Sequence, residues 1–399
     1  MKRPMEFHHA TQPAALTRGE FLYAAALAGG AALVCLVGCA GNHALVAWEQ
    51  IPPRSEDPRL QAIAVALLAP SPHNKQPWLV ALSGNDTLEL RIDTQRTMPF
   101  ADPYYRQIYI SEGAFLELLI IALQGLGYQP EVTLFPGAGS KESLPLTAPI
   151  ARVRLGRTGS LADPLGKFVS ERRSNKRPYD RDNVPASSVL SSFVAAQRGN
   201  PNVDCGVTVE RATVAAISKL AHQAVALDTS DAKRYAEMVE MFRFDNEERE
   251  RYRDGFGLAQ SGISGFKRWM AESFFISRNS ARSPTSDFAK EGIELAKKQV
   301  EGTPAWGWIV TPGNTRGDQV TAGRIYARGS LQAARLGLAQ HPMSQLLQEI
   351  GGMAELRQAL YAWLQVSRDA TVQMLFRLGY AKAVEHSPRR SSETLLVQT

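Results

Sequence analysis

The 399-residue sequence predicts an α+β protein built from two related halves. Helix-like and strand-like segments occur together: residues 60–68 form an apolar, helix-like run, whereas residues 79–82 and 305–310 are typical of strands. A repeat is also present, because the segment from Ser111 to Gly127 is similar to the segment from Thr321 to Leu338. Both copies begin with small residues and end near a glycine typical of a helix C-terminus. The chain is long enough for two such lobes.

The composition is that of an ordinary folded protein, with 44% hydrophobic and 21% charged residues. The net charge of +6 is mild, and no basic stripe is interleaved with aromatic residues, so we expect no nucleic-acid partner. The seven histidines and three cysteines show no His-x-x-x-His or Cys-x-x-Cys spacing, so we expect no metal site.

The amino terminus has the pattern of an export signal. An apolar run over residues 21–37 lies between Arg18 and Cys39, and its length suits a signal sequence better than a membrane span. Leu36-Val37-Gly38-Cys39 fits a lipobox, which predicts that residues 1–38 are removed and that Cys39 is lipidated and tethered to a membrane. Residues 17–22 resemble a twin-arginine motif in which Gly19 replaces the second arginine. The alternative is a buried N-terminal helix of a cytoplasmic enzyme.

Residues 69–78 (Ala-Pro-Ser-Pro-His-Asn-Lys-Gln-Pro-Trp) form the most informative segment of the chain. Its prolines fix their own φ angles and push the preceding residues out of the helical region, which predicts a rigid, extended loop. Such a loop displays backbone amides and short polar side chains to a ligand. Without further context, the same residues also fit an ordinary helix-to-strand turn.

This string resembles the Ala-Pro-Ser-x-x-Asn-x-Gln-Pro-Trp signature of the FMN-dependent nitroreductase superfamily. In that family the loop lies along the isoalloxazine ring of FMN. The resemblance therefore implies that Ser71, His73, Asn74 and Gln76 bind the cofactor. His73 could be a proton donor, or it could simply pack in the loop or face solvent. We refer to residues 69–78 as the ring loop.

A basic cluster at residues 171–180 (Glu-Arg-Arg-Ser-Asn-Lys-Arg-Pro-Tyr-Asp) resembles the Arg-Arg-Ser motif of the same family. A basic cluster alone is usually a solvated face, but arginine forks and a serine hydroxyl suit a phosphate. The resemblance implies phosphate binding by Arg172, Arg173 and Ser174, with Lys176 beside the flavin pyrimidine. Leu378-Gly379-Tyr380 and Pro388-Arg389-Arg390 resemble the family's closing segment. They imply that Arg389 and Arg390 also reach the phosphate.

The order of these motifs differs from that of a single nitroreductase subunit, because here the ring loop precedes the Arg-Arg-Ser motif. The chain therefore resembles two nitroreductase halves fused head to tail, as in the acg-type fused family. This implies an N-terminal half over residues 39–165 and a C-terminal half over residues 166–399, each a mixed sheet flanked by helices. Together the halves form a pseudo-dimer that we expect to be a monomer in solution.

One FMN per chain follows from this resemblance. The ring loop of the first half and the phosphate residues of the second half make one site between them. The reciprocal site is degenerate, because residues 53–56 and 197–202 stand where its motifs should be. The middle region, residues 230–300, is charged and aromatic. It fits either a lid over the flavin or a helical hairpin packed on the surface.

The resemblance implies an FMN-dependent oxidoreductase that passes electrons from flavin N5 to a nitro, quinone-like or other small acceptor. The chemistry belongs to the flavin, so no catalytic acid–base pair is expected. NAD(P)H is the expected donor if the protein is cytoplasmic, whereas an exported protein would need another electron source. The main alternative is an FMN-binding or storage protein without turnover, its flavin covered by the lid. A lipoprotein that kept the fold without the cofactor is a third reading.

Overall fold

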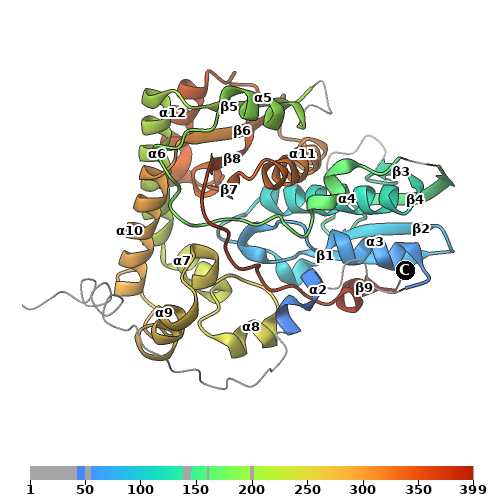
Figure 1. Ribbon diagram of the computed structural model, residues 1–399, viewed down its shortest axis with the longest axis horizontal. Coiled ribbons are helices and arrows are strands. Elements are labelled where there is room, and N and C mark those ends of the chain that lie inside the picture. Colours follow the sequence, from blue (N-terminus) through green and yellow to red (C-terminus); the bar gives the residue numbers. More distant parts are fainter. Residues whose placement is uncertain (1–42, 50–54, 138–144, 160, 198–201, 399) are drawn as a thin grey trace, which may run out of the picture. The chain divides into compact units, whose positions relative to one another are not determined.

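The computed structural model describes residues 43–49, 55–137, 145–159, 161–197 and 202–398. Residues 42–399 belong to one unit, which contains two sheets (Figure 1). The expected signal segment with Cys39 lies outside the described residues. So do Arg54 and Arg198 of the two degenerate motifs.

The first sheet has five strands in the order β3-β4-β2-β1-β9. β1 (Trp78–Ser83) and β2 (Thr87–Ile92) form an antiparallel hairpin, and β4 (Ala151–Thr158) pairs antiparallel with both β2 and β3 (Tyr128–Leu134). The last strand, β9 (Leu396–Val397), comes from the C-terminal end of the chain and lies parallel to β1. The sheet is therefore mixed, as predicted, and a strand of the second half completes it.

The second sheet has the order β5-β6-β8-β7. Its strands are β5 (Asp204–Thr208), β6 (Ala305–Thr311), β8 (Thr371–Gly379) and β7 (Ala339–Pro342). This order repeats β1-β2-β4-β3 of the first sheet. The prediction of a mixed sheet is wrong here, because every neighbouring pair is antiparallel and no fifth strand is added among the described residues.

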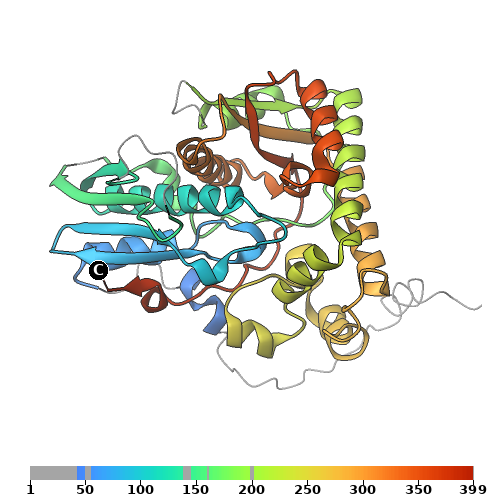
Figure 2. The same cartoon turned by 180° about the vertical axis from the view of Figure 1, so that it is seen from behind.

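The helices surround and separate the two sheets (Figures 1 and 2). Several begin at a side-chain cap: Asp57 accepts from the Arg59 N–H (2.8 Å), and Thr315 and Asp318 form a capping box. The helices are α2 (Val46–Glu49), α3 (Pro58–Ala66), α4 (Arg106–Gly125), α5 (Ser187–Ala195), α6 (Arg211–Ser230), α7 (Ala232–Met241), α8 (Asn246–Tyr252), α9 (Gly265–Met270), α10 (Asp287–Glu301), α11 (Arg316–Arg335) and α12 (Ala354–Leu364).

The pair α4 and α11 joins the two halves, and it confirms the predicted repeat. A Cβ on Gly113 would overlap the Val320 carbonyl oxygen, and a Cβ on Gly323 would overlap the Ile110 carbonyl oxygen. Gly113 and Gly323 occupy equivalent positions in the two copies, as do Ile110 and Val320. Each helix therefore makes the same contact with the other, which is the pattern of a two-fold interface.

α4 is the one described helix that is long and apolar enough to cross a membrane by length and composition. However, 83% of its most apolar stretch is buried within the structure, against α3, α11 and the first sheet. Glu117 on the same helix accepts hydrogen bonds from Arg324 (2.8 Å) and Arg328 (2.9 Å) of α11. Core packing, within the first half and against α11 of the second, thus accounts for its apolar character.

Helices α6 to α10 lie in one insertion between β5 and β6. The equivalent strands of the first half, β1 and β2, are joined directly by a hairpin turn at residues 84–86. The insertion contains the whole expected lid region, 230–300. It breaks between α7 and α8 at Phe242–Asp245 rather than forming one helix.

Glu112 on α4 is fully buried, and neither of its carboxyl oxygens has a hydrogen-bond partner. Burial, with the Asp93 carboxylate adding to it, raises the pKa of Glu112 well above its ordinary value of 4.5. The folded state therefore keeps this proton at a pH where the unfolded chain has lost it. Stability must fall as the pH rises above 4.5.

We expect Glu112→Gln to remove this pH dependence. The free energy of unfolding of the variant, relative to wild type, should increase between pH 5 and pH 8 by about 1 kcal/mol or more. Urea denaturation of both proteins at the two pH values measures it. A constant difference across this range would contradict the assignment of a protonated Glu112.

Candidate cofactor site

The ring loop forms a tight turn between α3 and β1. Three of its non-glycine residues, His73, Asn74 and Gln76, have left-handed backbones with φ of 49°, 57° and 53°. Ser71 is extended, and its Oγ accepts a hydrogen bond from the Gln76 N–H (3.0 Å). The prediction of an extended loop is therefore wrong for Pro72–Asn74, which make a 3₁₀ turn. Strained backbone of this kind is concentrated at functional sites.

The amides of Asn74 and Gln76 bind the ring loop to two distant segments. Asn74 donates through Nδ2 to the carbonyls of Gly255 (2.9 Å) and Pro388 (2.8 Å), and its Oδ1 accepts from Arg389. Gln76 donates through Nε2 to the Arg253 carbonyl (2.9 Å). Its Oε1 accepts from the Arg390 N–H (2.9 Å). The loop, the C-terminal tail and residues 253–255 of the insertion therefore meet at this point.

Arg172 and Arg389 lie together beside the start of the ring loop. Both donate to the Leu68 carbonyl, at 2.8 and 3.2 Å, and both are almost fully buried. Burial lowers the pKa of Arg172 to about 10, and burial together with Arg172 lowers the pKa of Arg389 well below its ordinary value. The Nε atom of each guanidinium is buried without a partner, and neither forms an ion pair with any described carboxylate.

Trp48 on α2 packs against both arginines. The centre of each guanidinium lies over its ring, at 5.8 Å for Arg172 and 4.9 Å for Arg389. The indole also stacks on His386 at 4.0 Å and donates to the Ser387 carbonyl (2.9 Å). Sequence reasoning missed Trp48, because it lies outside every motif and no local pattern indicates this contact.

Lys176 and His73 share one aromatic neighbour, Phe256. The Lys176 ammonium lies 3.5 Å from the centre of the Phe256 ring. The His73 and Phe256 rings pack edge to face, with their centres 5.5 Å apart. Burial, with Arg377 adding to it, lowers the pKa of Lys176 to about 7. Burial, with Lys176 and Lys75, lowers the pKa of His73 to about 3. His73 is therefore neutral at pH 7, which favours its packing role over a role as proton donor.

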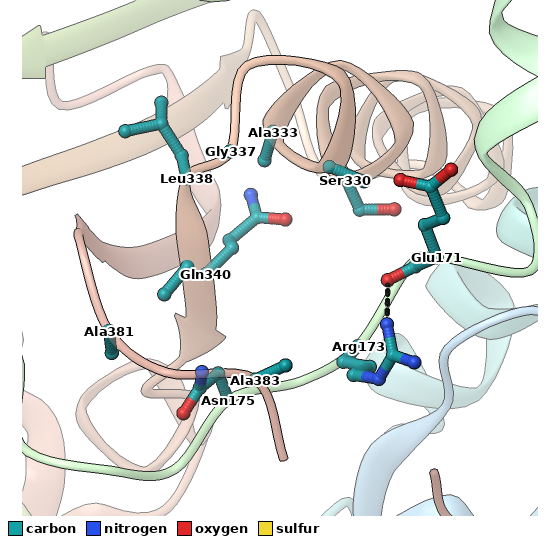
Figure 3. A pocket seen from close by; sticks show the side chains of 12 residues that line it. Glu171, Arg173, Asn175, Ser330, Ala333, Gly337, Leu338, Gln340, Ala381 and Ala383 are labelled. Carbon is teal, nitrogen blue, oxygen red and sulfur yellow. Dashed lines mark hydrogen bonds between the residues drawn. The ribbon is translucent and has the colours of Figure 1, made fainter. Parts of the chain in front are cut away.

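Three other predicted residues do not join Arg172 and Arg389. Arg390 donates to the carbonyls of Gln76 (3.0 Å) and Thr394 (2.9 Å), and so ties the tail to the loop instead of joining Arg172. Arg173 donates to the Glu171 carbonyl (2.6 Å) and lines a separate cavity (Figure 3). Ser174 forms an isolated parallel bridge with Gln340 of β7.

Seven of the ten residues predicted from the motifs therefore lie in one cluster: Ser71, His73, Asn74, Gln76, Arg172, Lys176 and Arg389. Residues from both halves contribute to it. Among the described residues, no group of three His, Cys, Asp or Glu side chains is arranged to hold a metal ion. Buried cations with unpaired N–H groups have the chemistry that suits an anionic ligand.

The comparisons with known proteins agree with this description. No protein-family model matches the chain. It is 28% identical over 303 residues to the probable NAD(P)H nitroreductase PigM of Serratia, a match that covers 72% of this chain and 80% of PigM. It is 35% identical over 124 residues to the uncharacterized protein Rv3127 of Mycobacterium tuberculosis. That second match covers 30% of this chain and about a third of the length of the relative (35%).

Solved structures with similar folds include the nitroreductase NfnB from sphigopyxis sp. strain HMH, with a TM-score of 0.39, 14% identity and coverage of 59% of this chain and 99% of that one. NfnB from Mycobacterium smegmatis is similar with a TM-score of 0.37 and 17% identity, over 57% of this chain and 94% of that one. These TM-scores are low. In sequence the chain is similar to a probable NAD(P)H nitroreductase over most of its length.

Proposed function

We propose that the protein is an FMN-dependent oxidoreductase of the nitroreductase type, with one FMN per chain between the two halves. The observation that carries this proposal is the pair Arg172 and Arg389, two buried cations with unpaired Nε atoms and no carboxylate partner. A phosphate group would satisfy both guanidinium groups, and FMN is the phosphate-bearing cofactor of this superfamily.

The other residues of the cluster have clear tasks around such a ligand. FMN, when bound, supplies the chemistry of hydride acceptance and electron transfer. Lys176, with a pKa of about 7, gains its proton fully when negative charge develops near it, because an opposite charge raises the pKa of an ammonium. Asn74 and Gln76 hold the ring loop against the tail, so the strained turn keeps a fixed position.

The donor and the acceptor belong to the same proposal. Reduced nicotinamide is the expected donor if the protein is cytoplasmic, since the relative PigM is named an NAD(P)H nitroreductase and the match covers 80% of it. An exported protein would need another electron source. A nitro or quinone-like compound is the expected acceptor. The proposal is tested by releasing flavin from the purified protein and then adding NADPH to the holoprotein. About one FMN per chain and bleaching by NADPH would support it, whereas a chain that binds no FMN after reconstitution would refute it.

A storage protein is the second candidate, and one feature of the structure favours it. Residues 253–256 of the insertion contact the ring loop through the Arg253 and Gly255 carbonyls, and Phe256 covers the Lys176 ammonium. A closed segment at this position would keep substrates away from a bound flavin. Protein that is bleached by dithionite but not by NADPH would favour storage.

Trp48 offers a direct test of the phosphate site. We expect Trp48→Ala to weaken FMN binding about tenfold, because loss of two cation–π contacts frees the Arg172 and Arg389 side chains. Affinity for riboflavin, which has no phosphate, should change little. Fluorescence titration with both flavins measures this. The control is Trp363→Ala, since Trp363 is half-exposed on α12; an equal loss of both flavins would instead indicate general loosening of the site.

We also propose that the protein is exported and anchored through Cys39. The support is the lipobox Leu36-Val37-Gly38-Cys39 and the preceding apolar run. We expect mass spectrometry of membrane-extracted protein to show a mature chain that begins at diacylated Cys39. A chain that still carries residues 1–38 in the membrane-free fraction would contradict it and would favour a cytoplasmic enzyme supplied with NAD(P)H.

A further inference from the structure

A cavity of about 180 Å³ lies beside the extended segment 171–175 (Figure 3). The C-terminal turn of α11, strand β7 and residues 381–383 of the tail complete its walls. Arg173 and Asn175 line this cavity, whereas Arg172 and Lys176 of the same segment contact the proposed cofactor cluster. The cavity is therefore separate from the FMN site.

Gln340 of β7 points into this cavity (Figure 3). Its side chain is only 3% exposed, yet neither the amide nitrogen nor the amide oxygen has a hydrogen-bond partner. Its backbone is held firmly, because the Gln340 carbonyl accepts from the Asn175 N–H (2.9 Å). Buried amides are nearly always paired, so this unpaired amide points to a ligand that satisfies both of its atoms.

The remaining walls limit the shape of that ligand. Small residues line the space around Gln340: Ala333, Ala334, Gly337, Ala381 and Ala383. They leave room for a flat ring but offer no further amide, since the Asn175 side chain already donates to the Lys382 carbonyl (2.9 Å). Arg173 lies at the edge of the cavity with a buried, unpaired Nε. Glu171 lines the cavity beside it and offsets part of its positive charge. A ring that carries a phosphate would be held by Gln340 at one end and by Arg173 at the other.

We propose that this cavity binds the base of a nucleotide: a planar heterocycle that presents a hydrogen-bond donor and an acceptor side by side. A glutamine amide pairs with such an edge through two hydrogen bonds, as it does with N6 and N7 of adenine. The carboxamide of nicotinamide presents the same pair of groups. The attached phosphate reaches Arg173. This site goes beyond the proposed FMN site and does not depend on it.

The experiment is calorimetric titration of the full-length protein, as purified, with AMP, with nicotinamide mononucleotide and with inorganic phosphate. We expect one of the two nucleotides to bind, and the tighter one identifies the source of the base. Gln340→Leu should weaken that binding tenfold or more, as a lost bidentate pair does. Ala383→Trp, at an exposed residue, should block the cavity without disturbing the core. Gln358→Leu, at an exposed glutamine of α12, is the matched control and should bind as wild type does.

Several results would overturn the proposal: no binding of either nucleotide, equal affinity in wild type and Ala383→Trp, or inorganic phosphate binding as tightly as both nucleotides. Circular dichroism shows whether Gln340→Leu has folded. If it has not, the nucleotide affinity of Ala383→Trp tests whether the cavity is the binding site. Flavin content is measured on the same samples. Failure of the FMN proposal would therefore appear as missing flavin, independently of the nucleotide titration.

Discussion

Replacing Arg172 with alanine is expected to reduce the affinity for FMN ten- to a hundredfold while leaving the affinity for riboflavin nearly unchanged. The Arg172 guanidinium is buried, has an unpaired Nε and lies beside Arg389 without a carboxylate partner. A charge-assisted hydrogen bond to phosphate contributes about 1.5–3 kcal/mol, which corresponds to that range of affinity. Fluorescence titration of the wild type and the variant with the two flavins measures the effect.

Arg172 is a better choice for this test than Arg389. The Arg389 side chain also holds Asn74 and the Ala69 carbonyl, so its removal would disturb the ring loop as well as the phosphate site. A suitable control is Arg152→Ala, because Arg152 is half-exposed and pairs with Glu89 on the first sheet. If the affinity for riboflavin falls as far as the affinity for FMN, Arg172 stabilises the fold instead of binding phosphate.

The sequence predicted the parts of the site that lie within short motifs. Ser71, His73, Asn74 and Gln76 lie in one cluster with Lys176, Arg172 and Arg389. That these residues bind FMN stays a prediction. The repeat of the long helix was also predictable, since its small residues mark a close helix–helix contact.

Other features could not be predicted, because they depend on contacts between distant segments. Trp48 contacts Arg172 and Arg389 because the N-terminal segment packs on the tail. Arg390 carries the same charge as Arg389 but is tied to Gln76 and Thr394, because successive residues of an extended tail point in opposite directions. The lone parallel strand β9 likewise depends on the tail crossing to the other half, which no local pattern encodes.

Gly113→Ala is expected to cause a large loss of stability for a change of one methyl group. The new Cβ would overlap the Val320 carbonyl oxygen, which belongs to helix backbone and cannot rotate away. Overpacking in a core costs about 1–3 kcal/mol, and contact with fixed backbone favours the upper end of that range. The gain in helix propensity, about 0.5–1 kcal/mol for Gly to Ala, is too small to reverse the sign. Denaturant unfolding at constant pH measures the difference.

The same helix supplies a matched control. Gly125→Ala, in the last turn of α4, meets nothing within 4 Å, so it should leave stability unchanged or raise it slightly. Gly323→Ala should behave like Gly113→Ala, because a Cβ there would overlap the Ile110 carbonyl oxygen in the equivalent contact. This symmetry also supports our proposal that the protein is a monomer: the face that each half would offer to a partner is already buried against the other half. If light scattering shows a stable dimer, or if Gly113→Ala and Gly125→Ala are equally stable, the helix pair is not the internal two-fold interface described here.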